Sequence, residues 1–105
     1  MAILTDSAFA SAYTHLGIAY SRIGKREEAI RKHRVAIEID STLSQAHYNL
    51  GAEYIKLGKL SLATNSFDRA VAIDSEYSLA HKALAKLYRY QGEVKIAENH
   101  DRLAK

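Results

Sequence analysis

Residues 44–77, SQAHYNLGAEYIKLGKLSLATNSFDRAVAIDSEY, decide the fold because the chain repeats their pattern. A shift of thirty-four residues in either direction brings residues of the same kind into register. A fixed period of this length is typical of a stacked array, in which each unit buries its apolar face against its neighbours. The repeated positions are Leu16, Leu50 and Leu84; Tyr20, Tyr54 and Tyr88; Gly24, Gly58 and Gly92; Ala29, Ala63 and Ala97; and Ala36, Ala70 and Ala104.

Each unit is predicted to form two antiparallel helices. In the first unit, an apolar face recurs at i, i+3, i+4 and i+7, as expected for a helix. Gly24 then favours the left-handed conformation that ends a helix, and the connection is too short for anything but a hairpin. The residues of that face are Tyr13, Leu16, Gly17 and Tyr20. The predicted helices span residues 8–23, 26–39, 43–57, 61–74, 77–91 and 94–104.

Small residues and helix caps refine this prediction. The pairs Gly17/Ala29, Gly51/Ala63 and Ala85/Ala97 are expected to let the two helices of each hairpin approach closely. A bulky residue at Gly51 should then cost a few kcal/mol by overpacking. The spacing of residues 42–45 predicts a capping box, and Ser61 is predicted to cap the second helix of its unit.

The first residues match the end of a unit. The segment AILTDSAF at residues 2–9 aligns without a gap on residues 36–43 and 70–77. We expect it to be the tail of a preceding unit, so that the chain would be a fragment of a longer protein. The alternative is a natural start whose first helix uses the same stop and cap.

Length and composition predict one folded domain of residues 1–105. The thirty-four-residue period divides this domain into repeats at 10–43, 44–77 and 78–105. Hydrophobic residues make up 48% and charged residues 26%, which excludes a disordered tail. The absence of cysteine excludes disulfides and thiolate chemistry. No apolar run is long enough to span a bilayer, and the N-terminus lacks the features of a signal peptide. The net charge of +3 is too small and too scattered to predict nucleic-acid binding.

The candidate metal, phosphate-binding and acid/base motifs lack the spacing or the surroundings that these sites require. No catalytic residue, metal or cofactor is therefore predicted. His47 and His81 lie one unit apart at core-facing positions, without a further ligand on the same helical face. The glycines Gly17 and Gly24 are too far apart for a phosphate-binding loop. The acidic pair that follows Gly24 begins a helix, where it complements the helix dipole.

The combination Leu-Gly-x-x-Tyr, then glycine, alanine, an aromatic residue and alanine within thirty-four residues, resembles the tetratricopeptide repeat. This resemblance covers three units and implies an all-α fold, in which helical hairpins stack as a right-handed α-solenoid. The sequence departs from the family at a frequent tryptophan and a frequent proline, and it keeps the aromatic residue of the second helix only as Phe67. Asp101 at the corresponding place suggests that the array ends or changes character near the last helix.

The resemblance also implies a concave groove, formed by the first helix of each unit, that holds a peptide segment of a protein partner. One end of this groove is predicted to be small and polar, its middle to carry Tyr48, and its other end to be cationic. Such polarity suits an acidic segment or a free carboxylate. The predicted groove residues are Thr14, Ile18, Ser21, Arg22, Gln45, Tyr48, Asn49, Ala52, Ile55, Lys56, Lys82, Lys86 and Arg89.

A subclass of this family grips a terminal carboxylate through lysine, asparagine and arginine at five places. The residues found at those places here are Thr14, Ile18, Asn49, Leu79 and Ala83, of which only Asn49 fits. We therefore do not expect this clamp. Asn49 is still expected to bond the backbone of a bound peptide.

Three functions remain open. The first is a non-catalytic binding module for a protein or peptide partner, with the charge favouring an acidic one. The second is a scaffold that associates end to end with itself, and the third is the substrate-recruiting arm of a larger enzyme. Neither nucleic acid nor membrane is an expected partner. The compartment stays open, with the cytoplasm favoured.

Overall fold

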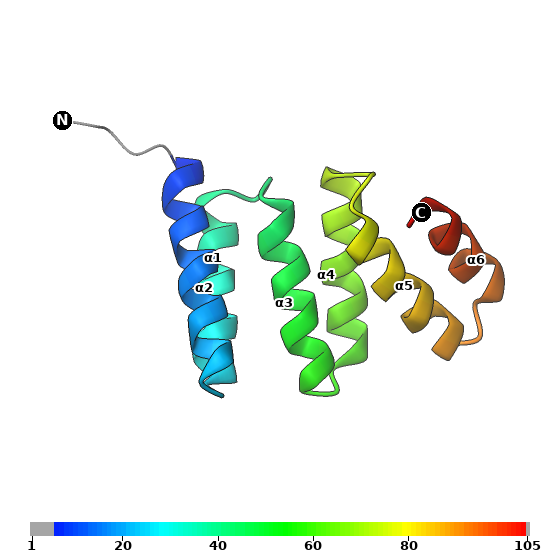
Figure 1. Cartoon of the computed structure of the whole chain (residues 1–105), viewed down its shortest axis with the longest axis horizontal. Helices are drawn as coiled ribbons and strands as arrows, with labels where there is room; N and C mark the ends of the chain where they lie inside the picture. Colours follow the sequence, from blue (N-terminus) through cyan, green and yellow to red (C-terminus); the bar gives the residue numbers. More distant parts are fainter. Residues whose placement is uncertain (1–5, 105) are drawn as a thin grey trace.

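The computed structural model describes residues 6–104, which form six helices in three hairpins. The first hairpin joins α1 (Asp6–Arg22) to α2 (Arg26–Ile39), and the second joins α3 (Ser44–Lys56) to α4 (Leu60–Ile73). The third joins α5 (Ser78–Tyr90) to α6 (Val94–Leu103). Figure 1 shows the hairpins side by side along the long axis of the molecule. The predicted all-α solenoid is therefore confirmed, and no described helix is long and apolar enough to cross a membrane.

The turn inside each hairpin is built on a glycine with positive φ. Gly24, Gly58 and Gly92 have φ values of 82°, 75° and 84°, a conformation that other residues rarely adopt. The next residue donates back to a tyrosine carbonyl, as in Lys59 N–H to Tyr54 O at 2.9 Å. These bonds form a Schellman motif, which satisfies carbonyls that the ended helix leaves free. The predicted glycine stops are thus confirmed.

The turns between hairpins depend on aspartate. Asp40 Oδ1 accepts from the backbone N–H and the hydroxyl of Thr42, and Asp74 Oδ1 accepts from the Glu76 N–H. Hydrogen bonds from Thr42 and from Ser7 lower the pKa of Asp40. The capping box predicted at residues 42–45 is wrong, because Thr42 bonds Asp40 instead and α3 begins without a side-chain cap. The cap predicted at Ser61 is wrong too, because α4 begins one residue earlier.

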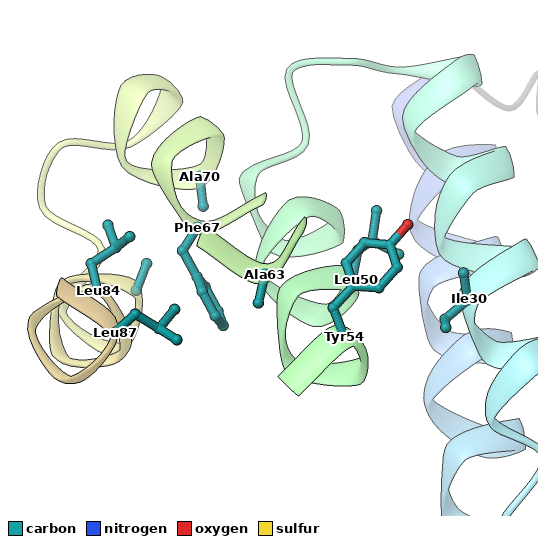
Figure 2. Close-up of a cluster of buried hydrophobic side chains, with 9 residues drawn as sticks. Ile30, Leu50, Tyr54, Ala63, Phe67, Ala70, Leu84 and Leu87 are labelled. Atoms are coloured by element: carbon teal, nitrogen blue, oxygen red, sulfur yellow. The ribbon is translucent and has the colours of Figure 1, made fainter. Parts of the chain in front are cut away.

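The main core runs across the hairpins. It comprises buried side chains from α2, α3, α4 and α5, which Figure 2 shows as sticks. Its members are Ile30, Leu50, Tyr54, Ala63, Phe67, Ala70, Ala80, Leu84 and Leu87. Polar contacts tie the same hairpins together: Arg34 donates to the Tyr54 hydroxyl at 2.7 Å, and the Tyr88 hydroxyl donates to Asp68 at 2.9 Å. Burial and this carboxylate raise the pKa of Tyr88 to about 12.

The first hairpin differs from the other two. Leu16 was predicted to face the core, but it is 42% exposed, whereas Leu50 and Leu84 are buried. The reason is that α3 and α5 pack against the preceding α2 and α4, while among residues 6–104 no helix precedes α1. In addition, α1 begins at Asp6, four residues before the position that matches the start of α3. Residues 6–9 of the predicted tail are thus part of α1, and residues 2–5 lie outside the described residues.

Candidate functional site

Two neighbouring hollows lie along the predicted groove. The α1/α3 hollow has a volume of about 230 Å³, and the α3/α5 hollow has a volume of about 500 Å³. Ten of the thirteen predicted groove residues line one of them. The α1/α3 hollow holds Ile18, Ser21, Arg22, Asn49, Ala52 and Lys56, and the α3/α5 hollow holds Tyr48, Ile55, Lys82 and Lys86. Gln45 is exposed but lines neither hollow.

Thr14 does not belong to the groove surface. Its side chain is completely buried, so it offers no surface to a ligand. Its hydroxyl has no hydrogen-bond partner among the described residues. The prediction for Thr14 is therefore wrong, because a position that faces an open groove in one unit is covered in another.

Arg89 already forms an ion pair within the chain. Its guanidinium donates to Asp101 Oδ2 of α6 at 2.6 Å, and about half of each side chain remains exposed. Such a surface ion pair contributes little stability, but it places a carboxylate beside the arginine. The cationic end predicted from three side chains is therefore reduced to Lys82 and Lys86, which have no ion pair among the described residues.

The α1/α3 hollow contains a buried charge and a buried histidine that the sequence analysis did not assign to the groove. Glu53 is 4% exposed, and it pairs with Arg26 at 3.1 Å and with Lys56 at 3.8 Å. His33 has no exposed surface, and this burial lowers its pKa, although the charge of Glu53 raises it in part. The Nδ2 atom of Asn49 is buried without a partner, so its predicted bond to a peptide would require the side chain to move.

The α3/α5 hollow combines an apolar lining with two lysines. Tyr48 is one of its lining residues, and the centroid of its ring lies 5.2 Å from that of Tyr77 and 5.4 Å from that of Phe67. Lys82 and Lys86 are four residues apart on α5 and are exposed. The apolar residues that complete the lining are Leu60, Leu79, Ala83, Leu87 and Tyr90. Leu60 and Leu87 were not among the predicted groove residues because they lie outside the predicted groove face.

The described residues contain no cluster of three or more histidines and carboxylates that could hold a metal ion. What they offer instead is an open surface with apolar and cationic side chains.

Comparison with known proteins agrees with this architecture. Two family models described as tetratricopeptide repeat match residues 12–45 and 44–77. Comparison with curated protein sequences gives no significant match. Among solved structures, the second TPR of Spaghetti (RPAP3), bound to the HSP90 peptide SRMEEVD, superposes with a TM-score of 0.87 at 21% identity. The match covers 94% of this chain and 92% of that one.

Two further structures are similar. The first TPR of Spaghetti, bound to the same peptide, has a TM-score of 0.87 at 22% identity over 98% of this chain and 82% of its own. A crystal structure of MamA has a TM-score of 0.85 at 24% identity over 93% of this chain and 57% of its own. The matched repeats and the three stacked hairpins give one conclusion: this chain belongs to the tetratricopeptide repeat family.

Proposed function

We propose that this chain is a non-catalytic interaction module that holds a peptide segment of a protein partner in its concave groove. The α3/α5 hollow would receive an apolar side chain of the peptide, and Lys82 and Lys86 would contact acidic residues beside it. The observation that carries this proposal is the α3/α5 hollow itself, where two lysines that form no ion pair within residues 6–104 border an apolar lining that is open to solvent.

Physical chemistry supports an acidic peptide. An apolar side chain that enters the hollow removes apolar surface from water, which gives affinity. Charge complementarity adds specificity and speeds association. A similar structure, the second TPR of Spaghetti, has a bound peptide, SRMEEVD, with three acidic side chains. Four of the five clamp places differ here, so the proposed recognition depends on Lys82 and Lys86 and not on that clamp.

Charge reversal at Lys82 and Lys86 tests the groove. The probe is a fluorescent peptide, Glu-Glu-Leu-Glu-Glu, measured by anisotropy at low salt, with Glu-Glu-Ala-Glu-Glu as its apolar control. We expect saturable binding that needs the leucine and that falls at least about tenfold in the variant Lys82→Glu/Lys86→Glu, because two attractions become repulsions. Arg89 is left unchanged because Asp101 already engages it.

The matched control is Lys59→Glu/Lys95→Glu, which changes the net charge equally at exposed lysines outside both hollows. This control should bind the probe like the unmodified chain. An equal loss in both variants would mean that only net charge matters, and unchanged binding in the groove variant would overturn the groove assignment. Circular dichroism of each variant should show the same helical content.

A second candidate, end-to-end association, is favoured by one observation. Phe9 and Leu16 on α1, and Ile23 just after its end, are 46%, 42% and 67% exposed, and they recur at a seven-residue spacing. The matching positions one unit later are Leu43, Leu50 and Leu57, of which Leu50 on α3 is buried against the preceding hairpin.

Light scattering across a concentration range tests this candidate. Association should raise the apparent mass with concentration, and Leu16→Glu should abolish the rise, because a charge cannot be buried without a partner. Leu62→Glu, a change at a side chain of similar exposure on α4, should leave the rise intact. A constant monomer mass at every concentration would exclude the candidate.

A further inference from the structure

A third hollow, of about 590 Å³, lies between α2 and α4, with side chains of α3 at its base. We name it the α2/α4 hollow. It shares no lining residue with the two hollows of the groove. Its lining includes the buried His47 and Ser66 together with the guanidinium groups of Arg34 and Arg69.

In the third hairpin, His81 occupies the position that matches His47, and both of its ring nitrogens have a hydrogen-bond partner. The ring of His81 lies with Nε2 2.9 Å from the Ser75 carbonyl and with Nδ1 2.7 Å from Nδ1 of His100. A carbonyl only accepts, so Nε2 of His81 carries the proton, and Nδ1 of a neutral His81 is an acceptor. His100 must therefore donate from its Nδ1. The two rings lie 5.0 Å apart, so the ring of His100 occupies the space beside His81.

His47 lacks this second partner. Its Nε2 lies 3.1 Å from the Ser41 carbonyl, which matches the first bond of His81 one unit later. By the same reasoning, Nδ1 of a neutral His47 is an acceptor. The residue thirty-four positions before His100 is Ser66, which is too short to fill the place of an imidazole. No described residue bonds Nδ1 of His47, although the side chain is 93% buried and lines the hollow.

The charges around the hollow are predominantly positive. Neither Arg34 nor Arg69 has an ion pair among the described residues, and Arg34 donates instead to the neutral hydroxyl of Tyr54. Among the described residues that line the hollow, Glu38 is the one carboxylate. An arginine without a partner favours a carboxylate, which its planar group can bind in a bidentate manner.

We propose that the α2/α4 hollow is a second peptide-recognition site, which takes from a partner a side chain with a planar N–H donor, imidazole or carboxamide, next to a carboxylate. The donor bonds Nδ1 of His47, as His100 bonds His81 in the third hairpin. The neighbouring carboxylate contacts Arg69. This site shares no lining residue with the groove, so a partner can engage both sites.

The test compares three capped tripeptides that differ only in the middle residue: Ac-Glu-His-Glu-NH2, Ac-Glu-Asn-Glu-NH2 and Ac-Glu-Ala-Glu-NH2. Binding is followed by the NMR signals of the His47 ring at pH 8, where a free imidazole is neutral. We expect the histidine and asparagine peptides to shift these signals saturably, with the alanine peptide at least about tenfold weaker. Equal affinity of the three peptides would overturn the proposal.

Two variants of the chain locate the site. Ser66→His should fill the hollow with the ring that His100 supplies in the third hairpin, so that binding of the histidine peptide falls at least about tenfold. Arg69→Ala, a change at an exposed side chain, should weaken all three peptides. The control Ser61→His places the same ring at an exposed position of α4 and should leave binding unchanged. Unchanged binding in both Ser66→His and Arg69→Ala would overturn the proposal, whereas Lys82→Glu/Lys86→Glu tests the groove separately.

Discussion

Replacing Phe67 by alanine is expected to lower the free energy of unfolding by about 3–5 kcal/mol, the usual range for a large aromatic residue in a core. Phe67 is 1% exposed and belongs to the cluster that joins the second and third hairpins. Its ring contacts the place where Gly51 has no side chain, and it lies 5.4 Å from the ring of Tyr48. Since a domain of this size is stable by about 5–15 kcal/mol, this loss is a large share of the total.

Urea unfolding followed by circular dichroism measures this effect. The control Leu62→Ala removes a side chain on the same helix that is 41% exposed, and it should cost less than about 1 kcal/mol. An equally small loss for Phe67→Ala would contradict the packing described for α3 and α4.

Gly51 supplies a further check of the same contact. A Cβ atom at Gly51 would lie 2.9 Å from Cζ of Phe67, closer than carbon atoms pack. Gly51→Ala should therefore be destabilising in the unmodified chain, even though alanine is the better helix former by about 1 kcal/mol. In the Phe67→Ala background the ring is absent, and the same change should become stabilising. A cycle of the two substitutions measures this coupling.

The helices could be predicted from the sequence because their signals are local. The thirty-four-residue period and the glycines after each first helix placed all six helices, with boundaries within two residues of those observed. The prediction of close packing at Gly51 also had a local basis, although the closest neighbour of this glycine is the ring of Phe67 and not Ala63.

What the sequence could not predict depends on neighbours that the repeat does not specify. The period assigns Leu16 and Leu50 the same environment, yet among residues 6–104 a preceding hairpin covers Leu50 and none covers Leu16. Thr14 is buried, and Arg89 pairs with a carboxylate of α6 inside its own hairpin. Since each difference depends on which side chains of other helices lie nearby, the groove could be predicted as a face but not residue by residue.

His33 is a position where a single substitution should stabilise the chain. It has no exposed surface, and neither ring nitrogen has a hydrogen-bond partner among the described residues. A Cβ atom at Gly17 would lie 2.6 Å from Cε1 of His33, so this ring packs on Gly17 as Phe67 packs on Gly51. Each buried nitrogen without a partner costs about 1–3 kcal/mol. His33→Phe repeats the arrangement of the second hairpin and should raise the free energy of unfolding by about 1–3 kcal/mol at pH 7.5.

The same substitution should reduce the sensitivity to acid. Burial lowers the pKa of His33 in the folded chain, so the unfolded chain, whose histidines have pKa values near 6.5, takes up a proton first as pH falls. The contribution of a neutral His33 is thus complete above about pH 6.5 and is lost as pH falls below it. Burial also lowers the pKa of His100, and His81 acts in the same direction. Part of the loss of folding stability in acid should therefore remain in His33→Phe.

Urea unfolding at pH 7.5 and at pH 5.5 tests both statements. We expect His33→Phe to be more stable than the unmodified chain at pH 7.5 and to lose less stability at pH 5.5. The control His15→Phe removes an exposed histidine of α1 and should change the difference between the two pH values little. A less stable His33→Phe, or one with an unchanged pH dependence, would mean that the ring nitrogens of His33 find partners in solution. The buried side of the α1/α3 hollow would then be hydrated, because water is the one donor and acceptor small enough to reach both nitrogens.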